Sequence, residues 1–172
     1  LGSTWSLPKD DSSNMTRNEM YEQIVSLLGG RVAEALFVGD ISVGASNDIE
    51  RATEIARSMV TRFGMSKRFG LVGLATVESQ YLDGRAALNC SDKTAAEIDE
   101  EVVAILRESY EKALALLKDN RELMDKLADY LIEKETITGK EFMTIFRKEK
   151  GLPEPEEKKV ENEPAAQKSE MQ

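Results

Sequence analysis

The 172-residue sequence contains no histidine and a single cysteine. Without histidine, the chain cannot supply a Ser-His-Asp triad or any other catalytic group that uses an imidazole. A structural zinc site takes about four Cys or His ligands, and Cys90 supplies one. A disulfide within the chain is also excluded, which is typical of proteins from a reducing compartment. By itself the chain therefore lacks the polar catalytic groups that hydrolases usually use.

Aromatic residues, positive charge and long apolar runs are scarce as well. Aromatics make up 6% of a chain that is 41% hydrophobic, so its core must consist mainly of Leu, Ile, Val, Ala and Met. No apolar run approaches the roughly 20 residues that cross a bilayer. Lys and Arg total 23 against 32 Asp and Glu, which gives a net charge of −9. Because phosphate binding needs clustered positive charge, we expect no nucleic-acid partner.

The chain divides by composition into a folded part and a tail. We expect a folded domain over residues 1–150 and a disordered tail over residues 151–172, which hold three of the four prolines and almost nothing apolar. The first residue is Leu1 rather than Met, and no cleaved signal is recognisable near it. We therefore expect the sequence to be a fragment or a processed piece of a longer protein.

Hydrophobic spacing predicts a mainly α fold, a helical bundle of about five helices with at most a short β segment. Capping boxes at Thr16–Glu19 and Thr138–Glu141 mark two helix starts, and Ser91 is a plausible cap for a third. A short strand is expected within residues 71–77 and a loop over residues 78–90. The helices are expected near residues 17–36, 46–63, 92–118, 121–132 and 139–148.

The pair Gly29-Gly30 interrupts the first expected helix and costs it about 2 kcal/mol relative to two alanines. Either the helix breaks at this pair, or another backbone packs so closely that a Cβ would not fit. Residues 31–35 remain good helix sequence beyond the pair. The sequence therefore favours close packing.

One carboxylate has an unusual position on the second expected helix. At about 100° per residue, Asp48 falls within the apolar arc that includes Ala52 and Met59. A carboxylate that faces a core is costly unless it is hydrogen-bonded, paired or bound to a metal. The alternative is that the first turn tolerates Asp, since free amides and the helix dipole favour an anion. The residues alone favour this second interpretation.

Other candidates for chemistry have simpler explanations. The acidic cluster at residues 97–101 surrounds its helix in nearly every direction, which indicates a solvated face rather than a cation or acid–base site. Met59 and Met124 have the spacing of core residues. Cys90 lies beside Asp92, whose charge disfavours a thiolate nucleophile. The chain contains no Gly-x4-Gly-Lys-Ser/Thr phosphate loop.

Four separated motifs occur in a specific order and spacing over residues 1–148. They are Leu27-Leu28-Gly29-Gly30-Arg31-Val32-Ala33-Glu34, Gly44-Ala45-Ser46-Asn47-Asp48 with Arg51-Ala52-Thr53, Ala56-Arg57-Ser58-Met59-Val60-Thr61 with Gly64-Met65-Ser66, and Thr94 with Glu97-Ile98-Asp99-Glu100-Glu101-Val102. Together they resemble the FtsH family, which are membrane-anchored AAA+ zinc metalloproteases. Two usual family residues differ here, since Val43 replaces a Thr and Ala35 replaces a Glu. Neither is a zinc ligand.

This resemblance implies a function for the longer protein. It implies the C-terminal part of a peptidase domain whose zinc is held by Asp48 and by two histidines of a His-Glu-x-x-His helix upstream of Leu1. The general-base Glu of that helix also lies upstream, so the chain contains no catalytic residue and is expected to be inactive alone. The resemblance further implies ATP and magnesium on an absent ATPase module, protein substrates, and a homo-hexamer. A membrane anchor would place the hexamer at the cytoplasmic face of the inner or plasma membrane.

A second interpretation belongs to a different class of function. The chain could be a non-catalytic helical oligomerisation or interaction module from a truncated or degenerate gene. A His-Glu-x-x-His motif a few tens of residues before Leu1 would support the protease, whereas a start codon near Leu1 would support the module. A soluble enzyme that uses only carboxylates would need a metal cluster that the sequence does not contain.

Overall fold

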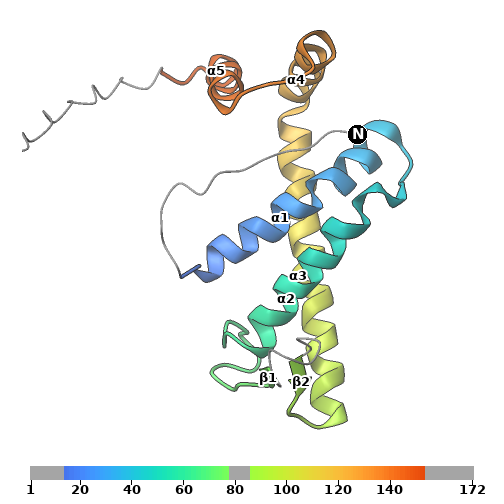
Figure 1. Cartoon of the computed structure of the whole chain (residues 1–172), viewed down its shortest axis with the longest axis vertical. Coiled ribbons are helices and arrows are strands. Elements are labelled where there is room, and N and C mark those ends of the chain that lie inside the picture. The colour runs from blue at the N-terminus through green and yellow to red at the C-terminus, as the bar shows by residue number, and fades with distance from the viewer. Residues whose placement is uncertain (1–13, 78–85, 154–172) are drawn as a thin grey trace, which may run out of the picture. The chain divides into compact units, whose positions relative to one another are not determined.

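The computed structural model describes residues 14–77 and 86–153 of the chain. Its contacts divide the chain into two compact units, Leu1–Asn120 and Arg121–Gln172. The first unit contains α1 (Arg17–Ala33), the π-helical turn η1 (Glu34–Val38), the 3-10 turn η2 (Val43–Ala45), α2 (Ser46–Thr61), β1 (Ala75–Val77), β2 (Ala86–Leu88) and α3 (Asp92–Asp119) (Figure 1). The second contains α4 (Arg121–Lys134) and α5 (Gly139–Lys150). The mainly α class with a short β segment is confirmed. None of the helices described is both long and apolar enough to cross a membrane.

The predicted capping residues start their helices as expected. At α1 the amide of Glu19 donates to the Thr16 hydroxyl at 3.2 Å, and the Thr16 amide donates back to the Glu19 carboxylate at 2.6 Å. The same reciprocal pair, Thr138 with Glu141, starts α5. The Ser91 hydroxyl accepts a hydrogen bond from the Thr94 amide in the first turn of α3. These bonds satisfy amides that a helix leaves free at its N-terminus.

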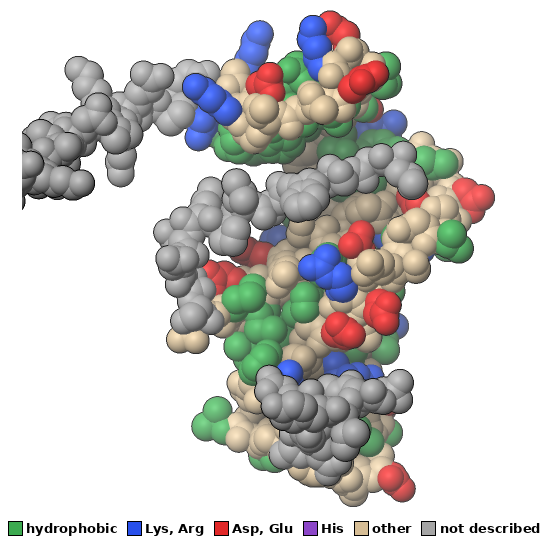
Figure 2. Space-filling model, in the orientation of Figure 1, with side chains coloured by type: hydrophobic (Ala, Val, Ile, Leu, Met, Phe, Trp, Pro, Cys, Tyr) green, Lys and Arg blue, Asp and Glu red, His purple; other side chains and the backbone are tan. Residues whose placement is uncertain are grey.

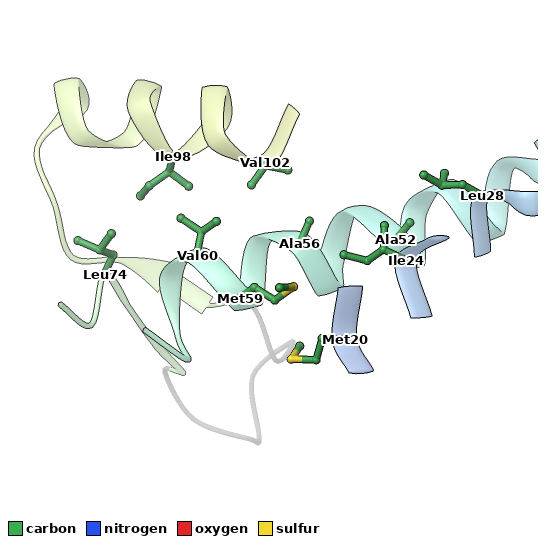
Figure 3. Close-up of a cluster of buried hydrophobic side chains, with 10 residues drawn as sticks. All are labelled: Met20, Ile24, Leu28, Ala52, Ala56, Met59, Val60, Leu74, Ile98 and Val102. Atoms are coloured by element: carbon green, nitrogen blue, oxygen red, sulfur yellow. The ribbon is translucent and has the colours of Figure 1, made fainter. Parts of the chain in front are cut away.

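The hydrophobic core of the first unit lies between α1, α2 and α3 (Figure 3). Ile24 of α1, Val60 of α2 and Ile98 of α3 have no exposed surface. The α2 face is otherwise built from small or flexible residues, with Ala52 fully buried and Met59 3% exposed. Aliphatic residues and methionine therefore fill this core, as the shortage of aromatics predicted.

Gly29 and Gly30 do not break α1, which continues through them to Ala33. A Cβ added at either glycine would meet no atom within 4 Å, apart from the helix's own backbone. The prediction that a neighbouring backbone packs closely on this pair is therefore wrong within the part of the chain that is described. The helix changes instead at Glu34, where five residues adopt π-helical geometry.

The segment after α2 differs in two details from the sequence prediction. Because α2 ends at Thr61, Phe63 is not on its buried stripe and is 48% exposed. The predicted strand is confined to β1 and pairs antiparallel with β2, with Ala75 opposite Leu88. The prediction of a loop over residues 78–90 missed β2. A strand of three residues is too short to show an alternating pattern of apolar and polar side chains.

The second unit is a pair of helices with few buried side chains. Leu123 and Leu127 of α4 are buried, whereas no residue of α5 is. Hydrogen bonding links the two helices, since the Tyr130 hydroxyl donates to the Glu141 carboxylate at 3.1 Å. Gly151 ends α5 with a left-handed φ of 62°. Most of the predicted tail, residues 154–172, lies outside the residues described.

Candidate functional site

The candidate metal ligand Asp48 lies where the segment after α1 enters α2, and residues 38–44 of this segment are exposed. We call residues 34–48 the open turn. Ala45 is its one buried residue. Three of its large apolar side chains face solvent, with Val38 76%, Ile41 62% and Val43 88% exposed. Figure 2 shows hydrophobic and acidic side chains together on the surface over this part of the first unit.

Hydrogen bonds between Glu34 and Ser42 connect the beginning of the open turn with its later half. The Ser42 hydroxyl donates to the Glu34 carboxylate, and the Ser42 amide donates to the same carboxylate at 3.3 Å. Arg31, one turn earlier, lies 3.4 Å from this carboxylate. The Ser42 hydroxyl, more than its amide or Arg31, holds the pKa of Glu34 below its usual range. Glu34 is therefore an anion with three partners at neutral pH.

A short turn then connects Ser42 to α2. Ser42 has extended geometry and caps η2, where its hydroxyl accepts from the Gly44 amide at 3.1 Å. The amide of Ser46 closes this turn by donating to the Val43 carbonyl, and α2 begins at the same residue. Asp48 lies in the first turn of α2. Hydrogen bonds thus link Glu34 to the turn that leads directly into the candidate ligand.

Asp48 is half-buried and lies one helical turn before Ala52, which is fully buried. This position confirms that the Asp48 face of α2 continues into the core. Within the described ranges, 14–77 and 86–153, no hydrogen bond or ion pair to its carboxylate is formed. No residue in these ranges caps α2 with its side chain either. A carboxylate that is neither paired nor used as a cap retains its full capacity for an external cation.

The described residues do not complete a metal site. They contain no group of three or more Cys, Asp or Glu side chains placed to hold an ion. Asp48 is nevertheless chemically suited to zinc, which accepts carboxylate oxygens beside imidazole nitrogens. The remaining imidazole ligands would have to come from another segment, since this sequence contains no histidine.

The acidic cluster of α3 forms ion pairs with arginines from other parts of the first unit. Arg68 forms ion pairs with Glu97 at 3.2 Å and Glu100 at 3.1 Å, and Arg57 pairs with Asp99 at 2.8 Å. Asp99 and Glu100 are 63% and 71% exposed, so they face solvent as predicted. The pairing partners were not predicted, because they come from α2 and from the segment after it.

Three other residues that the sequence analysis considered, Met59, Met124 and Cys90, belong to no group of functional side chains among the described residues. Met59 is buried in the core, and Met124 of α4 is half-buried. Cys90 is a half-buried free thiol that packs against the core cluster. Sequence reasoning missed the Glu34–Ser42 pair. One signal for it was present, since a serine before a short turn often caps it with its hydroxyl.

Comparison with known proteins extends the motif resemblance to most of the chain. The family model for peptidase family M41 matches residues 1–145. Proteins named ATP-dependent zinc metalloprotease FtsH from Clostridium perfringens and Lancefieldella parvula are each 48% identical, over 145 and 149 residues. One from Thermotoga maritima is 41% identical over 152 residues. These matches cover 84%, 87% and 87% of the chain and 20%, 23% and 25% of the relatives. The chain thus spans about a quarter or less of the length of these curated relatives.

Proposed function

The chain belongs to peptidase family M41, and on that basis we propose that it is the C-terminal part of a zinc metalloendopeptidase domain. The observation that carries the proposal is Asp48. It is a half-buried carboxylate with no partner among the described residues, on the first turn of a helix whose other end is anchored in the core. It also lies within the motif in which the family resemblance implies a zinc ligand.

The role of this chain would be to supply one ligand in a fixed direction. A carboxylate on a well-packed helix can bind zinc without losing much conformational freedom. When bound, zinc polarises a carbonyl group and lowers the pKa of a water molecule. The two histidine ligands and the general-base Glu would come from a segment upstream of Leu1. We therefore expect the 172-residue chain alone to hydrolyse no peptide and to bind zinc weakly.

The complete protein would carry the remaining functions. We propose an ATPase module that uses ATP and magnesium to unfold protein substrates, and a membrane anchor, both outside this chain. The names of the relatives support ATP dependence, and their greater length leaves room for further modules, whereas the membrane anchor rests on the family resemblance. The exposed side chains of Val38, Ile41 and Val43 support a further protein segment that covers the open turn. By family resemblance, the complete protein would be a homo-hexamer at the cytoplasmic face of the inner or plasma membrane.

The coding sequence next to this chain provides the first test. A His-Glu-x-x-His motif within a few tens of codons upstream of Leu1 is expected. A start codon near Leu1, with no such motif, would contradict the protease and support the non-catalytic helical module. Reading this sequence requires no assay.

Asp48→Asn in the complete protein provides the second test. An Asn side chain is nearly isosteric but holds Zn²⁺ far less strongly, so chelator-sensitive casein cleavage should fall by more than about 100-fold. ATP hydrolysis should persist, because the ATPase module is separate. Glu50→Gln, which neutralises an exposed carboxylate two residues away, is the matched control and should cleave casein normally. Full cleavage by the Asp48→Asn protein would leave Asp48 only a structural role at the start of α2.

A further inference from the structure

Hydrogen bonds between Glu34 and Ser42 join two segments that are eight residues apart in the sequence. Glu34 belongs to the π-helical end of α1, and Ser42 is eight residues later at the start of η2. Between them, Gly39 has a left-handed φ of 78°, and residues 38–41 are exposed. The carboxylate receives two bonds from the one residue, through its hydroxyl and its amide. The Glu34–Ser42 pair therefore links the two sides of the open turn.

The same hydroxyl also controls the start of α2. It accepts from the Gly44 amide, which sets the geometry of η2, and η2 runs without a break into α2. A Cβ added at Gly44 would come within 3.1 Å of the Ser42 Oγ and 3.7 Å of a Glu34 carboxylate oxygen. The three residues thus fit closely, although the neighbouring Val43 side chain is 88% exposed.

We infer that Ser42, held by Glu34, is a positioning residue that sets the direction of the Asp48 carboxylate towards the zinc site. The inference rests on the proposed function, because Asp48 acts as a ligand only there. Between Ser42 and Asp48, Ala45 is the one buried side chain, so burial fixes this stretch at a single point. The hydrogen bonds of Ser42 provide a second attachment before Asp48.

The inference is tested by zinc affinity in the complete protein. Ser42→Ala removes the hydroxyl as both donor and acceptor, and should weaken zinc binding by about 10- to 100-fold, the usual effect of losing a group that orients a ligand. Ser42→Thr keeps the hydroxyl and should restore most of the affinity. Ser26→Ala, an exposed serine on α1, is the matched control and should bind zinc normally. Competition with a chelator on folded protein measures the affinity independently of proteolysis.

Amide hydrogen exchange in the 172-residue chain tests the hydrogen bonds themselves. In the Ser42→Ala chain the Gly44 amide loses its acceptor and should exchange about tenfold faster, while amides of the α1 interior keep their rates. Faster exchange with unchanged zinc affinity would overturn the positioning role, as would unchanged exchange. A wild-type complete protein that binds no zinc would instead contradict the proposed function, before any variant is made.

Discussion

The two ends of the first unit contrast in what holds them together. At one end, which we call the packed end, the C-terminal half of α2 and the N-terminal half of α3 enclose Val60 and Ile98, both fully buried (Figure 3). Ion pairs from Arg57 and Arg68 to α3 add to this end. At the other end, the open turn has one buried residue and is held by the hydrogen bonds of Ser42.

The contrast shows that α2 can serve two purposes. Its C-terminal half belongs to the packed end, and its first turn belongs to the open turn. At the packed end, Val60 and Ile98 are fully buried, and the charges of Arg57 and Arg68 are paired with carboxylates of α3. The open turn exposes apolar side chains, and its Asp48 carboxylate has no partner among the described residues. Unsatisfied groups of both kinds in one place are typical of a surface that another segment completes. The packed end therefore stabilises the fold, and we propose that the open turn carries the function.

The largest stability effect is expected at the packed end. Ile98→Ala should lower the free energy of unfolding of the chain by about 3 kcal/mol, because it leaves a cavity among fully buried neighbours. Val103→Ala on the same helix removes a side chain that is 52% exposed and should cost less than about 0.5 kcal/mol. Denaturant titration measures both. Equal losses would show that the packed end has no special role in stability.

A smaller effect of opposite sign is expected on the helix that leads into the open turn. Gly30→Ala should stabilise the chain by about 1 kcal/mol, since a Cβ at this position meets no neighbour and alanine is the better helix former. In the complete protein the same change should reduce zinc-dependent proteolysis if a missing segment packs on this face. Normal proteolysis by the stabilised variant would show that no segment packs there.

The smallest effect concerns acid and the capping box at the start of α1. The amide and hydroxyl of Thr16 lower the pKa of Glu19, so this carboxylate stabilises the fold above the ordinary Glu pKa of about 4.3. The contribution is lost as the pH falls through the lowered pKa. Glu19→Gln should therefore be less stable than wild type at pH 7, and the difference should vanish towards pH 2. Glu22→Gln, at an exposed position on the same helix, is the matched control for the loss of one carboxylate.

Local patterns predicted much of the fold. The five helices, their capping residues at Thr16, Ser91 and Thr138, and the buried face of α2 all follow from residues near one another in sequence. Local amides and apolar spacing determine such features, so no knowledge of tertiary contacts is needed. The position of Asp48 on an inward face was predictable for the same reason.

Features that depend on tertiary contacts could not be predicted. The ion pairs of Arg68 join residues about 30 positions apart, and the Glu34–Ser42 bond depends on a π-helical turn that has no clear sequence pattern. The close packing expected at Gly29-Gly30 is not formed by the described residues, because a glycine pair indicates room for a neighbour without showing that one is present. The zinc role of Asp48 stays a prediction, since the chain holds one ligand of the set.

The zinc content of the complete protein tests this division of roles most directly. The measurement compares bound zinc per subunit in wild type, Asp48→Asn and the control Glu50→Gln, after dialysis against a weak chelator. We predict that wild type and Glu50→Gln retain their zinc and that Asp48→Asn retains less than about a tenth of it, while its free energy of unfolding as the 172-residue chain changes by less than about 0.5 kcal/mol. Full zinc content in Asp48→Asn would contradict the proposal that Asp48 is a zinc ligand.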